Sequence, residues 1–258
     1  MMKRIIFSCM TIVLLGAGGC SLFRGDADKS DECCGGCVAE NQPESPQSLQ
    51  APAAEPLHPD SSDWPTLFDS TLSNAEFERG VWYYDEKHRL TADKDQCIWS
   101  KRDYENFVLD LEYACAPAAN SGVLIYATDT KNWIPNTVEI QIQDDLNPHW
   151  AKVGDTWRNG GLFGHLAPKV KNVLPAGEWN RMTITARGQK IKVAVNNEIT
   201  VDADLAEWKS ATKNPDGSDI PKWLSKPWAE LPTKGRIGLQ GKHGQATIFF
   251  RNIKIKEL

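Results

Sequence analysis

The segment with the clearest chemical pattern is VEIQIQDD, at residues 138–145. Alternate side chains of a β-strand leave on opposite faces, so its three aliphatic residues share one face, and the other face carries Glu139, Gln141 and Gln143. The aliphatic row needs a core, whereas an acid beside two amides suits a sheet that grips a polyol. The polar row is equally compatible with the solvated side of an antiparallel sheet, and the segment by itself does not separate the two interpretations.

The residues after this strand add groups for acid–base or metal chemistry. Asp144 could bind a metal ion, pair with a nearby cation or simply form a turn. His149 and His165, which are neutral near pH 7, could serve as acid, base or metal ligand, or could be structural. Asp144 and His149 are the candidate ligands of a divalent metal ion, although no spacing in the sequence requires one.

Short alternating runs with polar turns between them must position these groups. The alternation predicts further strands at 107–113, 123–128, 181–186, 191–195, 199–202, 236–240 and 246–256. No segment shows a helical period over ten or more residues, so the fold class is all-β: a sandwich, barrel or jelly roll. Two insertions, 147–172 and 203–234, interrupt the pattern, and the second is expected to form a lid or wall.

The N-terminal part has the features of an export signal and a lipid anchor. Two basic residues precede an apolar run that is too short to span a membrane, and small residues lead to Cys20 in AGGC, which resembles a bacterial lipobox. We expect a signal peptide at 1–19, a lipidated Cys20 that holds the protein on a membrane of the cell envelope, and a disordered tether at 20–61. The folded domain is then expected at 62–258. Simple secretion after signal cleavage is the alternative.

Composition limits the class of partner. The 258 residues carry a formal net charge of -5, so no basic surface is expected and nucleic acid is not a predicted partner. The ten tryptophans could stack on sugar rings, although Trp is also common in the core of β-sandwiches.

Six short motifs occur in an order that resembles one family. They are NSGV at 120–123, VEIQIQDD at 138–145, GLFG at 161–164, GEWN at 177–180, GRIGLQ at 235–240 and FFRNIKI at 249–255. Together they are similar to the 3-keto-disaccharide hydrolase family, also described as 3-keto-glucoside lyase/hydratase, over residues 64–258. The resemblance implies a concanavalin A-like jelly roll of two curved antiparallel sheets, with a sugar site on the concave face. Family members usually have Arg where this chain has Tyr126, and Leu where it has Gln143.

The resemblance also implies a chemistry, in which a 3-keto-glycoside is cleaved by elimination and hydration without a nucleotide cofactor. The ketone acidifies the neighbouring C–H, so a base can remove that proton, and the enolate then expels the anomeric substituent. Such a site needs a base, a group that stabilises the enolate oxygen, and an acid for the leaving group. We assign Glu139 as the base, Arg158 as the cation for the enolate and His165 as a further acid–base group, each of which could instead be structural.

The candidate substrate-binding residues lie in the same segments. Gln141 would bind sugar hydroxyls, and Tyr126 would line the cleft. Trp133 and Trp157 would stack on the sugar, and the resemblance places His243 at the rim of the cleft. Two alternatives stay open: a non-catalytic carbohydrate-binding module of the same fold, and an ordinary glycoside hydrolase that uses two carboxyls.

Overall fold

The computed structural model describes residues 57–258. The predicted signal peptide at 1–19, the lipid on Cys20 and the tether up to residue 56 lie outside the described residues. Within the described part, the helices are short 3-10 turns, and none has the length and apolar character to cross a membrane.

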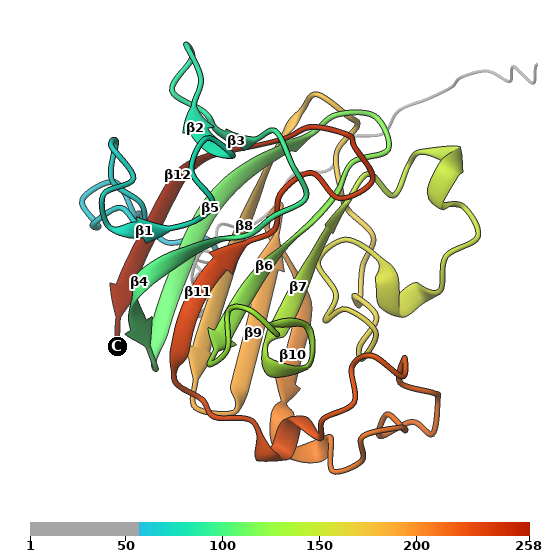
Figure 1. Cartoon of the computed structure of the whole chain (residues 1–258). Helices are drawn as coiled ribbons and strands as arrows, with labels where there is room; N and C mark the ends of the chain where they lie inside the picture. Colours follow the sequence, from blue (N-terminus) through green and yellow to red (C-terminus); the bar gives the residue numbers. More distant parts are fainter. Residues whose placement is uncertain (1–56) are drawn as a thin grey trace, which may run out of the picture. The chain divides into compact units, whose positions relative to one another are not determined.

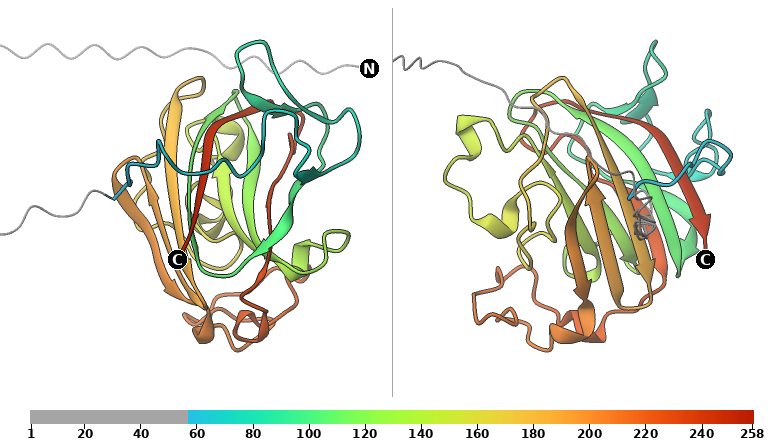
Figure 2. Two further views of the ribbon diagram at one scale, coloured as in Figure 1. Left: turned by 90° about the vertical axis from the view of Figure 1, so that its left-hand side faces the viewer. Right: turned by 180° about the vertical axis from the view of Figure 1, so that it is seen from behind.

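The described chain forms two antiparallel sheets that pack face to face (Figures 1 and 2). One sheet has five strands in the order β1-β4-β11-β6-β7, and the other has seven in the order β10-β9-β8-β5-β12-β3-β2. The strands are β1 (Ala75–Glu76), β2 (Trp82–Tyr84), β3 (Leu90–Ala92), β4 (Ile98–Tyr104), β5 (Phe107–Cys115), β6 (Asn120–Ala127), β7 (Val138–Gln143), β8 (Trp179–Arg187), β9 (Lys190–Val195), β10 (Glu198–Asp204), β11 (Gly235–Leu239) and β12 (Ile248–Glu257). The 3-10 helices are η1 (Ile134–Asn136), η2 (Pro148–Trp150), η3 (Asp155–Trp157), η4 (Leu205–Glu207) and η5 (Trp228–Glu230). This architecture confirms the prediction of a concanavalin A-like jelly-roll sandwich.

Alternation along the strands directs one face of each sheet into a shared core. The three aliphatic residues of β7 are fully buried there, as are the inward-facing residues of β5: Phe107, Leu109, Leu111 and Tyr113. Burying one such side chain contributes about 1.5–3 kcal/mol, so the register of both strands is strongly fixed. The opposite face of β7 therefore has to carry Glu139, Gln141 and Gln143.

Strand β6 contains an irregularity near its end. Arg236 and Gly238 of β11 pair with Ala127 and Leu124 of β6, so a step of two residues on β11 faces a step of three on β6. This extra residue is a β-bulge, which rotates the following side chains relative to simple alternation. Tyr126, inside the bulge, has a φ of 61°.

The bulge sends the Tyr126 side chain into the core. Its ring packs edge-on against Phe107 with a centroid distance of 6.1 Å, and its hydroxyl lies 3.0 and 2.8 Å from the carbonyl oxygens of Glu105 and Gly188. The prediction that Tyr126 lines the cleft is therefore wrong, because one additional residue in the strand reverses the face on which the side chain emerges.

The insertion at 147–172 joins the five-stranded sheet along its β7 edge. The Gly160 and Phe163 amides donate to the carbonyls of Gln141 and Glu139, at 2.8 and 2.9 Å, and the Gln141 amide donates to the Gly161 carbonyl at 3.0 Å. Figure 1 shows this insertion beyond β7, with the insertion at 203–234 at the lower end of the sheet. Both insertions thus flank the face of the sheet that carries Glu139.

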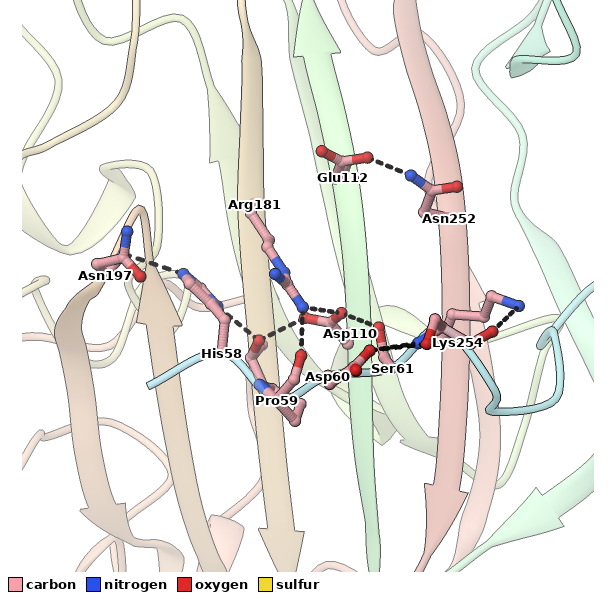
Figure 3. A network of polar contacts seen from close by, with 12 residues as sticks. His58, Pro59, Asp60, Ser61, Asp110, Glu112, Arg181, Asn197, Asn252 and Lys254 are labelled. Carbon is pink, nitrogen blue, oxygen red and sulfur yellow. Dashed lines mark hydrogen bonds and ion pairs between the residues drawn. The ribbon is translucent and has the colours of Figure 1, made fainter. Parts of the chain in front are cut away.

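Residues 58–62, which we call the N-terminal clasp, lie across the outer face of the seven-stranded sheet (Figure 3). His58 Nδ1 is 2.7 Å from the Thr183 hydroxyl of β8, and the Asn197 amide donates to His58 Nε2 at 2.9 Å. The Ser61 hydroxyl donates to the Asp110 carboxylate of β5 at 2.5 Å. His58 and Ser61 are both buried, so the prediction of a disordered tether that extends to residue 61 is wrong for this last part.

Candidate active site

A cavity of about 420 Å³ lies on the outer face of the five-stranded sheet, between the two insertions. Its lining contains most of the side chains that the sequence singled out, together with several that it did not: Asp95, Asn120, Trp133, Ile134, Glu139, Gln141, Trp157, Phe163, Trp223, Gln240 and His243. The structure thus brings together five of the predicted site residues in the lining of one cavity: Glu139, Gln141, Trp133, Trp157 and His243. It adds Asp95, Asn120, Phe163, Trp223 and Gln240.

Glu139 projects from β7 over Gly122 of the neighbouring strand β6. A Cβ atom on Gly122 would lie only 2.3 Å from the Glu139 carboxyl oxygen, so the carboxyl group occupies space that the glycine leaves open. Burial in the cavity, and then the nearby charge of Asp95, raises the pKa of Glu139 to about 8. A carboxyl group with such a pKa can take up and release a proton near neutral pH.

A row of amides fixes Gln141 beside Glu139. Its Nε2 donates to Asn120 Oδ1 at 3.0 Å and lies 3.5 Å from Gln143 Oε1, and Gln143 Nε2 donates to Asp145 at 2.9 Å. The Gln141 side chain is buried, and its Oε1 has no hydrogen-bond partner within residues 57–258. Because an unsatisfied buried acceptor is costly, this oxygen is suited to accept a hydrogen bond from a ligand hydroxyl.

His243 and Asp95 form a hydrogen-bonded pair at the cavity. His243 Nδ1 lies 2.6 Å from Asp95 Oδ2, and His243 also forms a backbone bridge with Asn120 at the start of β6. A carboxylate on Nδ1 fixes the orientation of an imidazole and leaves Nε2 available for proton transfer. Sequence reasoning missed Asp95 because it lies in a loop, and only the fold brings it to a histidine far along the chain.

Aromatic side chains form the other part of the cavity lining. The Trp157 ring lies 4.9 Å from that of Phe163 and 6.2 Å from that of Trp223, measured between centroids. Trp133 packs on Trp99, with centroids 6.4 Å apart. Trp223 comes from the insertion at 203–234, so this insertion supplies a wall of the cavity, as expected.

Two residues assigned to catalysis lie elsewhere. His165 is buried, stacks on Trp228 with ring centroids 3.5 Å apart, and places Nδ1 2.9 Å from the Phe163 carbonyl. Burial lowers the pKa of His165 to about 4, so the ring is neutral. Arg158 donates to the carbonyls of Ala151 and Val153 within its own insertion, at 3.4 and 3.2 Å. Neither side chain lines the cavity, which corrects their predicted place in the site.

The structure does not assemble the candidate metal ligands either. Asp144 is buried and accepts a hydrogen bond from the Ala118 amide at 2.9 Å, whereas His149 packs against Trp150 on η2, with ring centroids 4.4 Å apart. Among residues 57–258 there is no group of three His, Cys, Asp or Glu side chains that could hold a metal ion. The structure therefore does not support the prediction that Asp144 and His149 are ligands of a metal ion.

A larger cavity of about 760 Å³ lies on the opposite side of the sandwich, beside the N-terminal clasp. Two of its three acids are paired with arginines: Asp110 binds Arg181 at 2.8 Å, and Glu112 binds Arg251 at 2.9 Å. The third, Asp60, accepts hydrogen bonds from the Ser62 amide and hydroxyl at 3.1 and 2.8 Å. Apart from His58, no aromatic side chain lines it. It therefore offers less to a sugar than the smaller cavity does, and the smaller cavity is the candidate active site.

A jelly-roll sandwich with a carboxyl group, amides and tryptophans around one cavity defines a carbohydrate-active protein. Residues 60–256 match the family model of the 3-keto-alpha-glucoside-1,2-lyase-like domain, and the chain belongs to this family.

Solved structures from Parabacteroides distasonis ATCC 8503 are similar to this chain. One, provisionally described as a glycosyl hydrolase, is 50% identical with a TM-score of 0.73, and the match covers 76% of this chain and 99% of that chain. Two others with the same description share the fold at 20% and 22% identity, with TM-scores of 0.58 and 0.57. These matches cover 72% and 76% of this chain, and 89% and 84% of those chains. Comparison with curated proteins gave no significant match.

Proposed function

We propose that the protein cleaves 3-keto-glycosides by eliminating the anomeric substituent and then adding water. The observation that carries this proposal is the Glu139 carboxyl group, which lies in the cavity with a pKa raised to about 8. The other acid in the lining, Asp95, is bound to His243. Ordinary glycoside hydrolysis uses a pair of carboxyls on either side of the bond, whereas elimination needs one base and a separate acid.

In this mechanism, the ionised Glu139 removes the proton from C2 of the sugar, and the electron pair passes to the C3 ketone as an enolate. The enolate then re-forms the ketone while the C1–O bond breaks, which leaves a C1=C2 double bond and the free leaving group. His243, oriented by Asp95, donates the proton to the leaving oxygen. Water then adds its hydroxyl to C1 and its proton to C2, which gives the free 3-keto sugar.

The amides of the cavity supply the remaining contacts. Gln141 Oε1 accepts a sugar hydroxyl. Asn120 and Gln240 line the same cavity, and their side-chain N–H groups would donate to the enolate oxygen in place of the arginine that the sequence suggested. Donors fixed before the reaction are effective because they need no reorganisation when charge develops.

The test compares a 3-keto-glucoside with its unoxidised parent. We expect release of the leaving group from the oxidised compound alone, and a loss of kcat by about 10²-fold or more in Glu139→Gln, the range typical of a lost general base. Equal cleavage of the parent sugar, or no turnover with or without divalent metal ions, would contradict the proposal.

A non-catalytic carbohydrate-binding module is the second candidate, and the aromatic part of the cavity favours it. Such a module would bind glycans saturably without cleaving them. Its affinity would stay unchanged in Glu139→Gln, because the carboxyl group would have no chemical role.

We further propose that the protein is exported and anchored in the cell envelope through a lipid on Cys20. The support is the sequence pattern at 1–20, which lies outside the described residues. In its native host, Cys20→Ser should move the protein from the membrane fraction to the soluble fraction. Retention of the variant in the membrane fraction would exclude the lipid as the anchor.

A further inference from the structure

We infer that the cavity selects 3-keto-glycosides with a flat, apolar leaving group such as an aryl or benzyl alcohol, which binds its aromatic side. This inference rests on the proposed function and names the substrate class of the same site. We call the apolar part of the lining the aromatic wall: Trp133, Ile134, Trp157, Phe163 and Trp223.

The aromatic wall begins directly beside the proposed base. The Phe163 amide donates to the carbonyl of Glu139 itself at 2.9 Å, which fixes Phe163 next to that residue along the β7 edge. Trp157 packs on Phe163, and Trp223 packs on Trp157. A group that leaves from C1 of a sugar held over Glu139 therefore has this surface within reach.

Contacts between separate loops hold the aromatic wall in place. Lys226, three residues after Trp223, donates to the side chain of Asn136 in η1. Ile134 lies in the same 3-10 helix, and Trp133 directly precedes it. The loop that carries Trp223 is thus tied to the loop that carries Trp133, so the two parts of the wall are positioned relative to each other before a ligand binds.

The two parts of the cavity differ in hydrogen-bonding capacity. The polar part contains Asn120, Gln240 and the Asp95–His243 pair, which can bind the hydroxyls of the ketosugar. The aromatic wall has no amide, acid or base, and its only side-chain donors are indole N–H groups. A second sugar could stack on these rings, but it would find few partners for its hydroxyls, whereas an aryl group stacks equally well and needs none.

The exposure of the aromatic wall points to a ligand as well. Trp223 and Ile134 are 53% and 41% exposed, and they rank among the most exposed large apolar side chains of the described chain. Exposed apolar side chains that gather around a cavity mark a binding surface, because water otherwise covers them at a cost.

The experiment compares the methyl and benzyl 3-keto-glucosides. Their leaving alcohols have nearly the same acidity, so a difference in rate reports contact with the aromatic wall rather than leaving-group chemistry. We expect kcat/KM to be about tenfold higher for the benzyl compound, which corresponds to one well-packed aromatic contact. Trp223→Ala should lower kcat/KM for the benzyl compound more than for the methyl compound, and so remove most of this preference. A matched control is Trp64→Ala, since Trp64 packs near Lys256 of β12, outside the cavity lining.

The outcomes separate this inference from the proposed function. If the methyl compound is cleaved as fast as the benzyl one, or a 3-keto-disaccharide is preferred over both, the inference fails while the proposed function stands. If neither glucoside is cleaved, the proposed function fails. Calorimetric binding of the two compounds then tests the aromatic wall by itself. Tighter binding of the benzyl compound that Trp223→Ala abolishes supports the aromatic wall, and equal affinities overturn it.

Discussion

The protonation state of one residue, Glu139, should control the rate. Burial, and next the charge of Asp95, raises the pKa of its carboxyl group to about 8, so at neutral pH most of the protein holds this group in the protonated form, which cannot act as a base. We expect kcat/KM for a 3-keto-glucoside to rise with pH through about 8. Above this pH Glu139 is fully ionised, so it contributes no further increase. A pH–rate profile that is flat from pH 6 to 9 would contradict the assignment of Glu139 as the base.

The absence of a side chain at Gly122 is equally important at the residue scale. A methyl group there would lie 2.3 Å from the Glu139 carboxyl oxygen and 2.9 Å from its Cγ, so Gly122→Ala must displace the carboxyl group. We expect a loss of kcat of about 10²-fold, since a misplacement of about 1 Å has effects of this size, with a stability cost of about 1–3 kcal/mol.

Gly154→Ala is the matched control for this substitution. Gly154 has a φ of -62°, and a Cβ atom on it would lie 3.9 Å from its nearest neighbour, Cδ1 of Trp157, which is an ordinary contact distance. Steady-state kinetics and urea unfolding of both variants provide the comparison. Full activity in Gly122→Ala would show that the position of Glu139 is not critical.

At the scale of single elements, local alternation explains what could be predicted from the sequence. Strand β7 is regular, so its aliphatic residues entered the core and Glu139 and Gln141 reached the cavity as expected. Strand β6 has a bulge, which period-two reasoning does not detect, and Tyr126 therefore faced the other way. His165 and Arg158 lie in an insertion whose path depends on its pairing with β7, and this pairing leaves no local signal.

The buried position of Tyr126 gives a prediction for strand β6. Tyr126→Phe removes a hydroxyl that lies 3.0 and 2.8 Å from two carbonyl oxygens and keeps the ring in the core. We expect the free energy of unfolding to fall by about 1–2 kcal/mol, with kcat/KM unchanged. Tyr83→Phe, which affects an exposed hydroxyl 3.1 Å from Asp93, is the control and should cost less. A loss of activity without a loss of stability in Tyr126→Phe would instead place this residue in substrate binding.

At the scale of the whole domain, the N-terminal clasp fixes where the chain enters the sandwich. The clasp binds β5 and β8 of the seven-stranded sheet, whereas the candidate active site lies on the outer face of the five-stranded sheet. Figure 2 shows the two sheets as separate layers, with the first described residues beside the seven-stranded one. The first described residues of the chain therefore lie on the side of the sandwich away from the candidate active site.

The clasp should also depend on pH through His58. Because the Asn197 amide donates to Nε2, the docked ring must be neutral with its proton on Nδ1, directed at Thr183. Burial is the main cause that lowers the pKa of His58 from its ordinary value of 6.5; the charge of Arg181 adds to it, and Asp110 opposes it. A histidine with a lowered pKa stabilises the docked state fully above pH 6.5 and loses this contribution as the pH falls towards the lowered value.

Hydrogen exchange measures this loss directly. After correction for the intrinsic exchange rate, we expect the backbone amides of the clasp to lose protection between pH 7.5 and pH 5, while those of β5 keep theirs. In His58→Ala the clasp should be poorly protected at both pH values, because the bonds to Thr183 and Asn197 are absent throughout. Protection of the wild-type clasp that stays constant over this range would show that Asp110, Arg181 and Ser61 hold the segment without His58, and the clasp would then be a fixed part of the sandwich.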